Sequence, residues 1–347
     1  MRDARFCSCS LCSQTKMAKL AINGFGRIGR AAFKIALEKN NLEVVAINDL
    51  TDAKTLAHLI QYDTVYGKYP KKVSAGEKSI NIDGKEYPIF AEPDPTKLPW
   101  KELNIDVVLE CTGRFIKDGK ARAHIEAGAK KVIISAPAKG GDVSTFLLGV
   151  NEDKYSNQDV VSNASCTTNC IAPVAQIIHS NFGVERAMMT TIHSYTADQN
   201  IQDGPHKDLR RARAAAQNIV PTTTGAAIAT AEVIPELQGL FDGLAVRVPT
   251  INGSLSDFTF LLKKDTTVEE INNVLTKTSQ EDRYKNILEV TNDPIVSSDI
   301  IGNPKSSIVD LSLTKVVGGN LIKIVVWYDN EWGYSNRLVE MVEHIIK

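Results

Sequence analysis

The residue with the clearest potential for covalent chemistry is Cys166, which stands in the short polar run Ser162–Cys170 (SNASCTTNC). An apolar-periodic stretch follows, so the run predicts a helix start and places Cys166 near the positive end of the helix dipole, where a thiolate is favoured. Pro173 weakens this prediction because its ring removes one interior hydrogen bond. Cys170, one turn further on, is predicted to be a small buried hydrophobe, and a cysteine placed like Cys166 is by itself more often structural than reactive.

His193 is a candidate base for that thiol among the six histidines of the chain. It ends an apolar run that predicts a strand, and Thr191, Ser194, Thr196 and Asp198 surround it with oxygen-bearing groups. Polar groups gathered at the carboxyl end of a strand are typical of a binding site. A histidine at the end of an apolar strand is also commonly a hydrogen-bonded core residue, so the residue types leave both interpretations open.

The glycine-rich turn at residues 24–29 (GFGRIG) indicates a second kind of chemistry. It follows a predicted strand directly and opens a predicted helix. Glycines at these spacings permit a tight turn, the close approach of a pyrophosphate and close helix–strand packing, with the helix N-terminus facing the phosphates. Asp49 ends the next predicted strand, where a carboxylate can accept hydrogen bonds from ribose hydroxyls. The predicted dinucleotide site consists of Gly24, Phe25, Gly26, Arg27, Ile28, Gly29 and Asp49.

Asp49 also predicts a preference between the two nicotinamide dinucleotides. The 2′-phosphate of NADP would bring negative charge against this carboxylate in a partly desolvated site, so NAD is the expected cofactor. Arg27 and Lys54 lie nearby in the sequence and could soften the repulsion.

The elements that must position these residues follow two patterns. A strand, a helix over 27–40 and the buried strand Leu42–Asn48 come first, and residues 105–137 repeat the alternation, with a helix expected over 117–129. This alternation predicts a doubly wound parallel sheet of the α/β class, with hairpins at its edge between residues 66 and 92. After about residue 165, β-rich runs with occasional helices predict an α+β unit with a mostly antiparallel sheet.

Two further segments complete the expected organisation. Residues 206–225 are polar and basic in their first half, which predicts a long ordered loop of functional importance. Residues 332–347 have the apolar spacing of an amphipathic helix. We expect a dinucleotide-binding domain of residues 17–165 and 330–347, and a catalytic domain of residues 166–329.

Composition and charge limit the classes of function. The 347 residues are 43% hydrophobic, with 40 Lys plus Arg against 41 Asp plus Glu and a net charge of −1. These are proportions of a soluble globular protein, and the lack of a basic excess argues against a protein that coats nucleic acid or an anionic membrane. No apolar run reaches the roughly 18 residues of a membrane span. We expect no membrane association and no specific nucleic-acid partner.

The six cysteines, at positions 7, 9, 12, 111, 166 and 170, are too sparse for a disulfide framework and favour a reducing compartment, here the cytoplasm. Three of them fall ahead of Met17. This Cys-x-Cys-x-x-Cys cluster could hold a metal, but no second cluster completes a set of four ligands. The segment also lacks the features of a secretory signal or transit peptide. Residues 1–16 are therefore predicted to be a disordered extension, and no metal site is expected.

Eight motifs of the chain occur in a highly specific order and spacing: INGFGRIGR, INDL, SNASCTTNC, TIHSYT, PHKDLRRARAAA, PTTTGAA, RVPT and WYDNEWGYSNR. In this the chain resembles the phosphorylating glyceraldehyde-3-phosphate dehydrogenases over essentially all of residues 17–347. The resemblance implies that Cys166 is the nucleophile and His193 its partner. It implies NAD-dependent oxidation of D-glyceraldehyde 3-phosphate through a cysteine thioester, which inorganic phosphate cleaves to 1,3-bisphosphoglycerate. It also implies a homotetramer, with the basic loop from about Tyr195 to Asn218 at subunit contacts.

The same resemblance implies the ligand contacts. The substrate phosphate is expected on Thr196, Asp198 and Arg247, and the attacking phosphate on Ser165, Thr167, Thr224 and Gly225. Asn330 is expected to contact the nicotinamide amide, with Tyr334 beside the same ring.

Some positions depart from the family pattern, and other activities stay open. Pro93 stands where the family commonly has arginine, and Gly204 replaces a more usual leucine. Erythrose-4-phosphate dehydrogenase has a substrate only one hydroxymethylene longer, which the motifs do not exclude. Aspartate-semialdehyde dehydrogenase shares the fold and a nucleophilic cysteine, but its substrate would leave the phosphate contacts without a purpose. A non-catalytic binding role is the third alternative, and the intact Cys166 and His193 argue against it.

Overall fold

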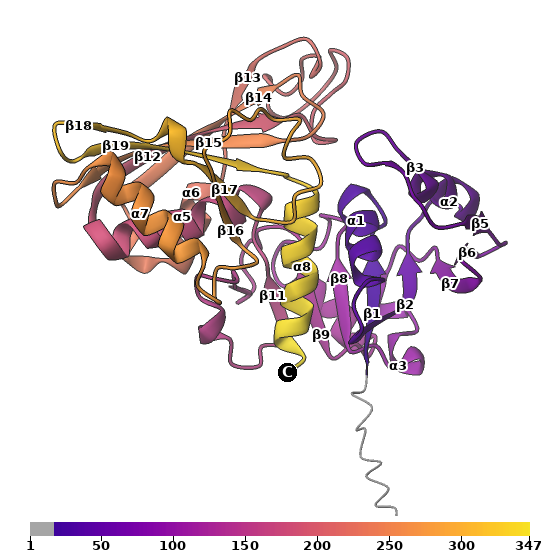
Figure 1. Ribbon diagram of the computed structural model, residues 1–347. Coiled ribbons are helices and arrows are strands. Elements are labelled where there is room, and N and C mark those ends of the chain that lie inside the picture. Colours follow the sequence, from indigo (N-terminus) through magenta and orange to yellow (C-terminus); the bar gives the residue numbers. More distant parts are fainter. Residues whose placement is uncertain (1–16) are drawn as a thin grey trace, which may run out of the picture.

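The chain folds into two halves, each built on one sheet (Figure 1). The structure is a computed structural model and describes residues 17–347. The predicted extension with its cysteine cluster lies outside the described residues.

The nine-stranded half has the strand order β10-β11-β9-β8-β1-β2-β7-β6-β5. Neighbours from β10 to β7 are parallel, whereas β5, β6 and β7 pair antiparallel. The predicted doubly wound sheet and its edge hairpins are both confirmed. The strands are β1 Ala18–Asn23, β2 Leu42–Asn48, β5 Val73–Ala75, β6 Ser79–Ile82, β7 Lys85–Phe90, β8 Val107–Glu110, β9 Lys131–Ile134, β10 Ser144–Thr145 and β11 Val160–Ser162, with a separate pair β3 Tyr62–Asp63 and β4 Gly67–Lys68.

The helices of this half are α1 Arg27–Ala36, α2 Ala53–Gln61, α3 Trp100–Leu103, α4 Ala123–Glu126 and the C-terminal α8 Trp332–Ile345. The helix predicted over residues 117–129 is wrong in its length, because only a 3₁₀ turn, Lys120–Arg122, and the four residues of α4 are helical. Gly119 and Gly128 lie near the two ends of the predicted helix. Their φ values of +69° and +102° are left-handed conformations that a helix cannot include.

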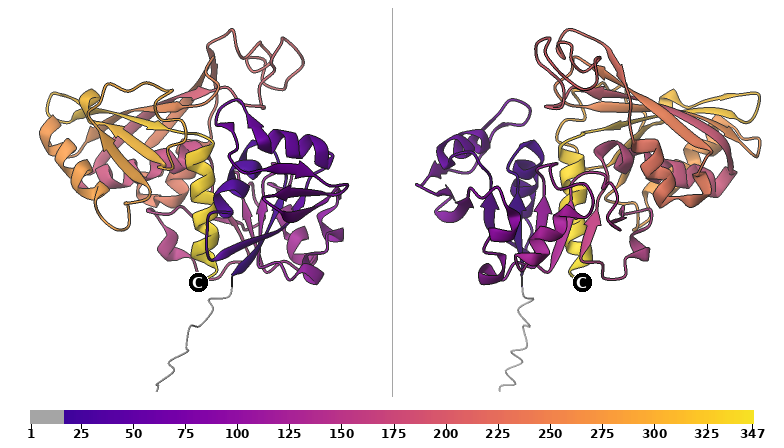
Figure 2. Two further views of the ribbon diagram at one scale, coloured as in Figure 1. Left: turned by 45° about the vertical axis from the view of Figure 1, so that its right-hand side comes forward. Right: turned by 180° about the vertical axis from the view of Figure 1, so that it is seen from behind.

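The eight-stranded half has the order β13-β14-β12-β15-β19-β17-β16, with β18 paired to β19. Most neighbours are antiparallel, as predicted, but β12 pairs parallel with β14 and β16 with β17. Residues 195–219 contain no helix or strand and project from the sheet as a long loop (Figure 2). The elements are β12 Val184–Ser194, β13 Val220–Thr222, β14 Phe241–Val248, β15 Ser254–Leu262, β16 Leu288–Thr291, β17 Ser307–Asp310, β18 Lys315–Val317, β19 Leu321–Tyr328, α5 Cys166–Phe182, α6 Ala226–Val233 and α7 Val268–Ser279.

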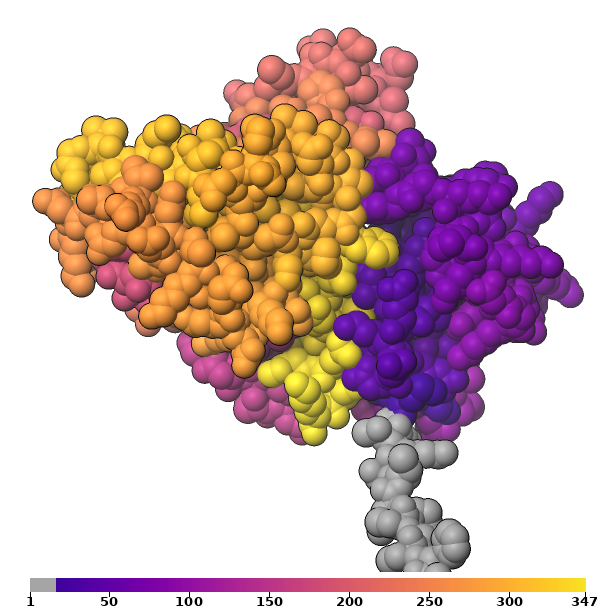
Figure 3. All heavy atoms as spheres, viewed as in Figure 1, coloured from indigo at the N-terminus to yellow at the C-terminus, as the bar shows by residue number. Residues whose placement is uncertain are grey.

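The chain passes between the halves at two points, and both carry predicted site residues. The first lies between β11 and α5, where Cys166 begins the helix. The second lies between β19 and α8, where Asn330 stands. Helix α8 then returns to the nine-stranded half, since Leu338, Met341 and Val342 share a hydrophobic core with strands β1 and β2. In the space-filling view its yellow atoms lie along the seam between the halves (Figure 3).

Candidate active site

Cys166 is the first residue of α5, and the turn before it is held in an unusual conformation. Ala164 is fully buried with φ +52°, a left-handed conformation that costs a non-glycine residue about 1 kcal/mol or more. Its amide N–H donates to Ser162 Oγ at 3.0 Å, and its carbonyl accepts from Tyr334 Oη at 3.0 Å. Ser165 then caps the helix by accepting a hydrogen bond from the Thr168 amide at 3.1 Å. The thiol thus lies where the free N–H groups of the first helical turn point.

His193 faces this thiol from the end of β12. Its Nε2 lies 3.4 Å from Cys166 Sγ, and its Nδ1 lies 2.6 Å from the carbonyl oxygen of Ser194. A carbonyl can only accept, so in the tautomer that bonds to it Nδ1 carries the proton and Nε2 turns a lone pair toward the thiol. In that tautomer His193 is a proton acceptor for Cys166.

Burial affects the charge state of the pair. It lowers the pKa of His193 to about 3, and the positive charge of Arg247 acts in the same direction. Burial also raises the pKa of the Cys166 thiol, against the charge of Arg247 and hydrogen bonds from Thr167. Burial thus disfavours the charged form of each group, whereas the helix start favours the thiolate of Cys166.

Arg247 lies beside this pair because β12 and β14 are parallel, with His193 and Arg247 in register. Its Nη1 donates to the Ser194 carbonyl at 3.0 Å and lies 2.8 Å from His193 Nδ1. Its Nε is buried without a hydrogen-bond partner, and within residues 17–347 the guanidinium forms no ion pair. A half-buried cation with unused donors is suited to hold an anion from outside the chain.

The other predicted phosphate contacts lie in two groups. The Thr167 hydroxyl, 4.0 Å from Cys166 Sγ, also lies 3.0 Å from the Tyr328 hydroxyl, and the Ser165 hydroxyl lies 2.8 Å from that of Thr168. The carboxylate of Asp198, by contrast, pairs with Arg211. Thr196 stands two residues before Asp198 in the long loop. Thr224 Oγ1 accepts from the Ala226 amide at 3.2 Å, and Gly225 is the N-cap of α6.

The predicted dinucleotide site is an open cleft at the end of the parallel strands, lined among others by Gly24, Gly26, Asp49, Pro93 and Thr112. Gly24 has φ +91°, and a Cβ there would lie 2.7 Å from the Thr112 amide nitrogen. A Cβ on Gly26 would meet nothing within 4 Å, so the backbone there is open to a ligand. Asp49 Oδ2 accepts from the Phe25 amide at 2.7 Å, which holds the carboxylate at the glycine-rich turn. The cleft therefore fits a pyrophosphate with a ribose beyond it.

The remaining residues of this turn pack or bind away from the cleft. Phe25 and Gly29 are buried and Ile28 is half-buried. A Cβ on Gly29 would lie 2.1 Å from the Gly24 carbonyl oxygen. The guanidinium of Arg27 binds Glu331 and Asp63. Arg27 was expected to be able to soften the charge of Asp49, but its own charge is already paired.

Asn330 and Tyr334 lie at the second passage between the halves. Asn330 Oδ1 accepts from Ser254 Oγ at 2.7 Å, and that hydroxyl accepts from the Ser194 amide at 3.1 Å. The amide of Asn330 is thus linked to the residue next to His193. Tyr334 is buried under the turn at Ala164 through the hydrogen bond described above.

Comparison with known proteins places the chain in a family. The model of the glyceraldehyde 3-phosphate dehydrogenase NAD binding domain matches residues 18–118, and that of the C-terminal domain matches residues 165–330. The chain belongs to the glyceraldehyde-3-phosphate dehydrogenase family. It is 57% identical to glyceraldehyde-3-phosphate dehydrogenase from Thermotoga maritima, over 95% of this chain and 100% of the relative. It is 55% identical to glyceraldehyde-3-phosphate dehydrogenase 1 from Bacillus cereus, over 95% and 98% of the two chains.

Two residues of this family member were not identified from the sequence. Tyr328 places its hydroxyl 2.8 Å from Thr191 Oγ1, and its ring lies edge-on to His193 at 6.0 Å. Arg211 donates to Thr222 Oγ1 at 3.0 Å and to the Thr223 carbonyl at 3.1 Å, and its charge also lowers the pKa of His193. Both stand inside quoted motifs, but only strand register and loop path decide which motif side chains face the site.

Neither a membrane-spanning helix nor a metal-binding cluster is found in the described part of the chain. No helix in residues 17–347 is long and apolar enough to cross a membrane. Over the same residues, no group of three or more His, Cys, Asp or Glu side chains could hold a metal ion.

Proposed function

We propose that this chain oxidises D-glyceraldehyde 3-phosphate with NAD and inorganic phosphate, through a thioester on Cys166, to 1,3-bisphosphoglycerate. One observation carries the assignment of residues. The thiol of Cys166 lies 3.4 Å from an imidazole nitrogen that can accept its proton when Nδ1 carries the ring proton, beside a half-buried arginine with unused donors. Family membership supplies the reaction class.

The first step is addition of the thiol to the aldehyde. As Sγ of Cys166 bonds to the aldehyde carbon, Nε2 of His193 takes the thiol proton and passes it to the developing alkoxide, which gives a hemithioacetal. NAD, when bound, supplies the acceptor for the hydride of that carbon. Nε2 of His193 takes the hydroxyl proton as the hydride departs, and a thioester remains on Cys166. The imidazolium then faces the sulfur that must leave.

The second step is cleavage of the thioester by phosphate. A phosphate oxygen attacks the acyl carbon, the C–S bond breaks, and the departing thiolate is stabilised by the imidazolium of His193. Ser165, Thr167, Thr224 and Gly225 are proposed to hold this phosphate, two of them at the start of α5 and two at the start of α6. A thioester is reactive enough for this attack, whereas the ester of a hydroxyl nucleophile would be less so.

Arg247, Thr196 and Asp198 are proposed to hold the phosphate of the aldehyde substrate. The half-buried guanidinium of Arg247, which forms no ion pair within residues 17–347, supports this role. Asp198 binds Arg211 instead of pointing its charge at the site, so its proposed role is to orient a cation.

The cleft at the glycine-rich turn is proposed to bind NAD. The backbone of residues 24–29 would hold the pyrophosphate and Asp49 the adenosine ribose, with Asn330 and Tyr334 at the nicotinamide end. We propose a dinucleotide-binding domain of residues 17–165 and 330–347, supported by the core that α8 shares with β1 and β2. Residues 166–329 would form the catalytic domain.

We further propose a homotetramer in the cytoplasm. The long loop exposes large apolar side chains, with Ile201 and Leu209 80% exposed and Ile219 71% exposed. Apolar side chains this exposed on one loop favour burial against another subunit. Free thiols at Cys111, Cys166 and Cys170 suit a reducing compartment. Light scattering after gel filtration should give the mass of four chains, and a monomer would contradict the proposal.

Steady-state kinetics tests the proposed reaction. NADH formation should require the aldehyde, NAD and inorganic phosphate together, and Cys166→Ala should abolish it while NAD still binds. A comparison with erythrose 4-phosphate separates the triose activity from the closely related tetrose activity. NADH formation by Cys166→Ala at the wild-type rate would refute the mechanism.

A further inference from the structure

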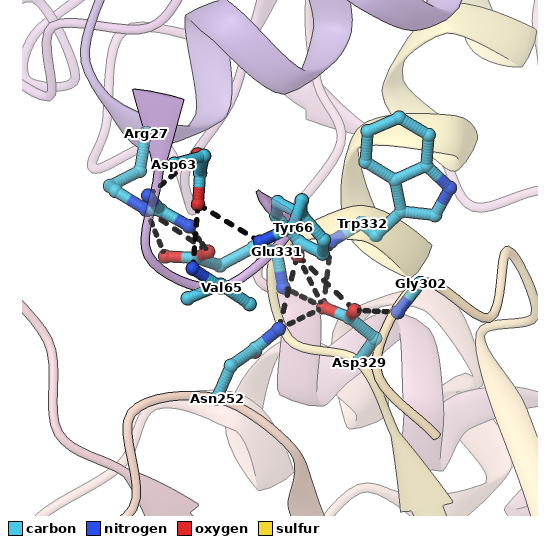
Figure 4. A network of polar contacts seen from close by, with 9 residues as sticks. All are labelled: Arg27, Asp63, Val65, Tyr66, Asn252, Gly302, Asp329, Glu331 and Trp332. Carbon is cyan, nitrogen blue, oxygen red and sulfur yellow. Dashed lines mark hydrogen bonds and ion pairs between the residues drawn. The ribbon is translucent and has the colours of Figure 1, made fainter. Parts of the chain in front are cut away.

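A buried carboxylate, Asp329, anchors the turn that carries Asn330. It is 1% exposed and accepts hydrogen bonds from five donors in four separate chain segments (Figure 4). Two are the amides of its own turn, Glu331 at 2.9 Å and Trp332 at 2.8 Å. The others are the Gly302 amide at 2.7 Å, Asn252 Nδ2 at 2.9 Å and the Tyr66 hydroxyl at 3.0 Å. The main chain on either side of Asn330 is therefore fixed.

Tyr66 brings the nine-stranded half into this anchor. It follows β3, whereas Asn252 and Gly302 belong to loops of the eight-stranded half. Its hydroxyl donates to Asp329 and accepts from Asn252 Nδ2 at 3.0 Å, which closes a triangle of hydrogen bonds across the two halves. Burial and the charge of Asp329 raise the pKa of Tyr66 far above its ordinary range, so the hydroxyl keeps its proton and acts as a donor.

A second link joins the same turn to the glycine-rich turn. Arg27 donates through Nε to Glu331 at 2.9 Å and through Nη1 to Asp63 at 2.9 Å, and its guanidinium lies 5.7 Å from the ring centre of Tyr66. Arg27 opens α1, where the pyrophosphate is proposed to bind. Both ends of the dinucleotide site are therefore tied to the residues that flank Asn330.

The side chain of Asn330 is fixed independently. Its Oδ1 accepts from Ser254 Oγ, so its Nδ2 keeps two donors for a ligand. With the backbone held by Asp329 and the amide oxygen held by Ser254, the direction of Nδ2 is determined. Of the two anchors, only Asp329 is contacted by a side chain from the nine-stranded half.

We propose that Asp329 and Tyr66 are positioning residues that hold Asn330 for the nicotinamide amide, across the junction of the two halves. The inference rests on the proposed function for the role of Asn330. Neither side chain is placed at the adenosine end of the cleft, so both act on the nicotinamide end alone.

Calorimetric titration of NAD and of ADP-ribose, which lacks the nicotinamide, tests this. Tyr66→Phe removes one hydroxyl and keeps the ring. We expect it to weaken NAD about tenfold, the equivalent of about 1.4 kcal/mol, and to leave ADP-ribose unchanged. The matched control is Tyr69→Phe, because Tyr69 is a tyrosine of the same half whose buried hydroxyl has no hydrogen-bond partner within residues 17–347. The control should change neither ligand.

A double-mutant cycle with Asn330→Ala identifies the route of the effect. Asn330→Ala should weaken NAD selectively, and Tyr66→Phe added to it should cause no further loss. Asp329→Asn places an amide N–H₂ among hydrogen-bond donors, so it should weaken NAD binding at least as much as Tyr66→Phe does. If Asp329→Asn does not fold, Tyr66→Phe alone tests the proposal. Equal weakening of both ligands, an unchanged NAD affinity, or additive losses would overturn the proposal. If the variants lose affinity for NAD but not for ADP-ribose, while the wild-type chain does not oxidise the triose phosphate, the proposed function is refuted and this inference stands.

Discussion

Replacing Arg247 with leucine should separate recognition of the substrate phosphate from the chemistry at the aldehyde. Leucine fills much of the space of the arginine stem but brings no charge and no donors. In the folded chain only Nη1 is used, in its hydrogen bond to the Ser194 carbonyl, while Nε is buried and unpartnered. The donors available to a ligand are therefore those that the substitution removes.

The size of the effect follows from those donors. Two parallel hydrogen bonds from a guanidinium to a phosphate are worth about 1.5 kcal/mol each or more, so kcat/KM for the phosphorylated aldehyde should fall by roughly two orders of magnitude. A smaller effect should appear on every substrate, because the charge of Arg247 lowers the pKa of both Cys166 and His193. Without that charge the thiolate is harder to form, and the imidazole is easier to protonate in acid.

The assay compares D-glyceraldehyde 3-phosphate with unphosphorylated glyceraldehyde over a range of pH. The loss on the phosphorylated substrate should exceed the loss on glyceraldehyde by at least about tenfold, and Arg247→Lys should fall between, since a lysine cannot make two parallel bonds. Equal losses on both aldehydes, with an unchanged unfolding midpoint, would refute a phosphate-binding role. Equal losses with a lowered midpoint would point to a folding role instead.

Four further predictions concern the thiol, the imidazole and the cofactor. An alkylating agent at neutral pH should modify Cys166 faster than Cys111, located by peptide mass spectrometry. Burial raises the pKa of both thiols, but at Cys166 the charge of Arg247 opposes it and His193 can accept the proton, whereas at Cys111 the charge of Glu110 adds to burial and the pKa rises to about 12. His193→Asn should slow turnover by roughly two orders of magnitude while NAD still binds. The folded-state pKa of His193, about 3 against an ordinary 6.5, means that the unfolded chain binds one more proton between these values, so stability falls as pH drops from 6.5 toward 3, by up to about 1.4 kcal/mol per pH unit. His193→Asn should flatten this slope in urea unfolding. Asp49→Gly should narrow the NAD to NADP ratio of kcat/KM, mainly by weakening NAD, because it removes the carboxylate at the ribose.

Opposite results would contradict each of these predictions. Fast alkylation of Cys111 with activity retained would remove Cys166 as the nucleophile. A His193→Asn variant with the same acid slope as the wild type would mean that His193 is not held neutral by the fold. Equal use of NAD and NADP by the wild-type chain would mean that Asp49 does not face the ribose.

The local elements of this protein follow from its sequence because they depend on neighbours along the chain. The strand Leu42–Asn48 has the bounds expected from its continuous apolar residues. Gly24 and Gly26 specify the turn into α1, and the apolar spacing of the C-terminal residues specifies α8. The quoted motifs also predicted the residues of the site, because the residue types of the family recur here in the same order.

Tertiary structure alone decided which of these residues meet and what charge they carry. Cys166 and His193 are 27 positions apart, and Arg247 joins them only because β12 and β14 pair in parallel register. Three of the five donors of Asp329 come from distant segments that no local pattern connects. Burial is likewise a property of the packed whole: the helix start favours a thiolate at Cys166, whereas burial raises the pKa of that thiol and lowers the pKa of His193. The periodicity of a segment indicates its preferred secondary structure, whereas contacts and desolvation arise only when the segments pack together.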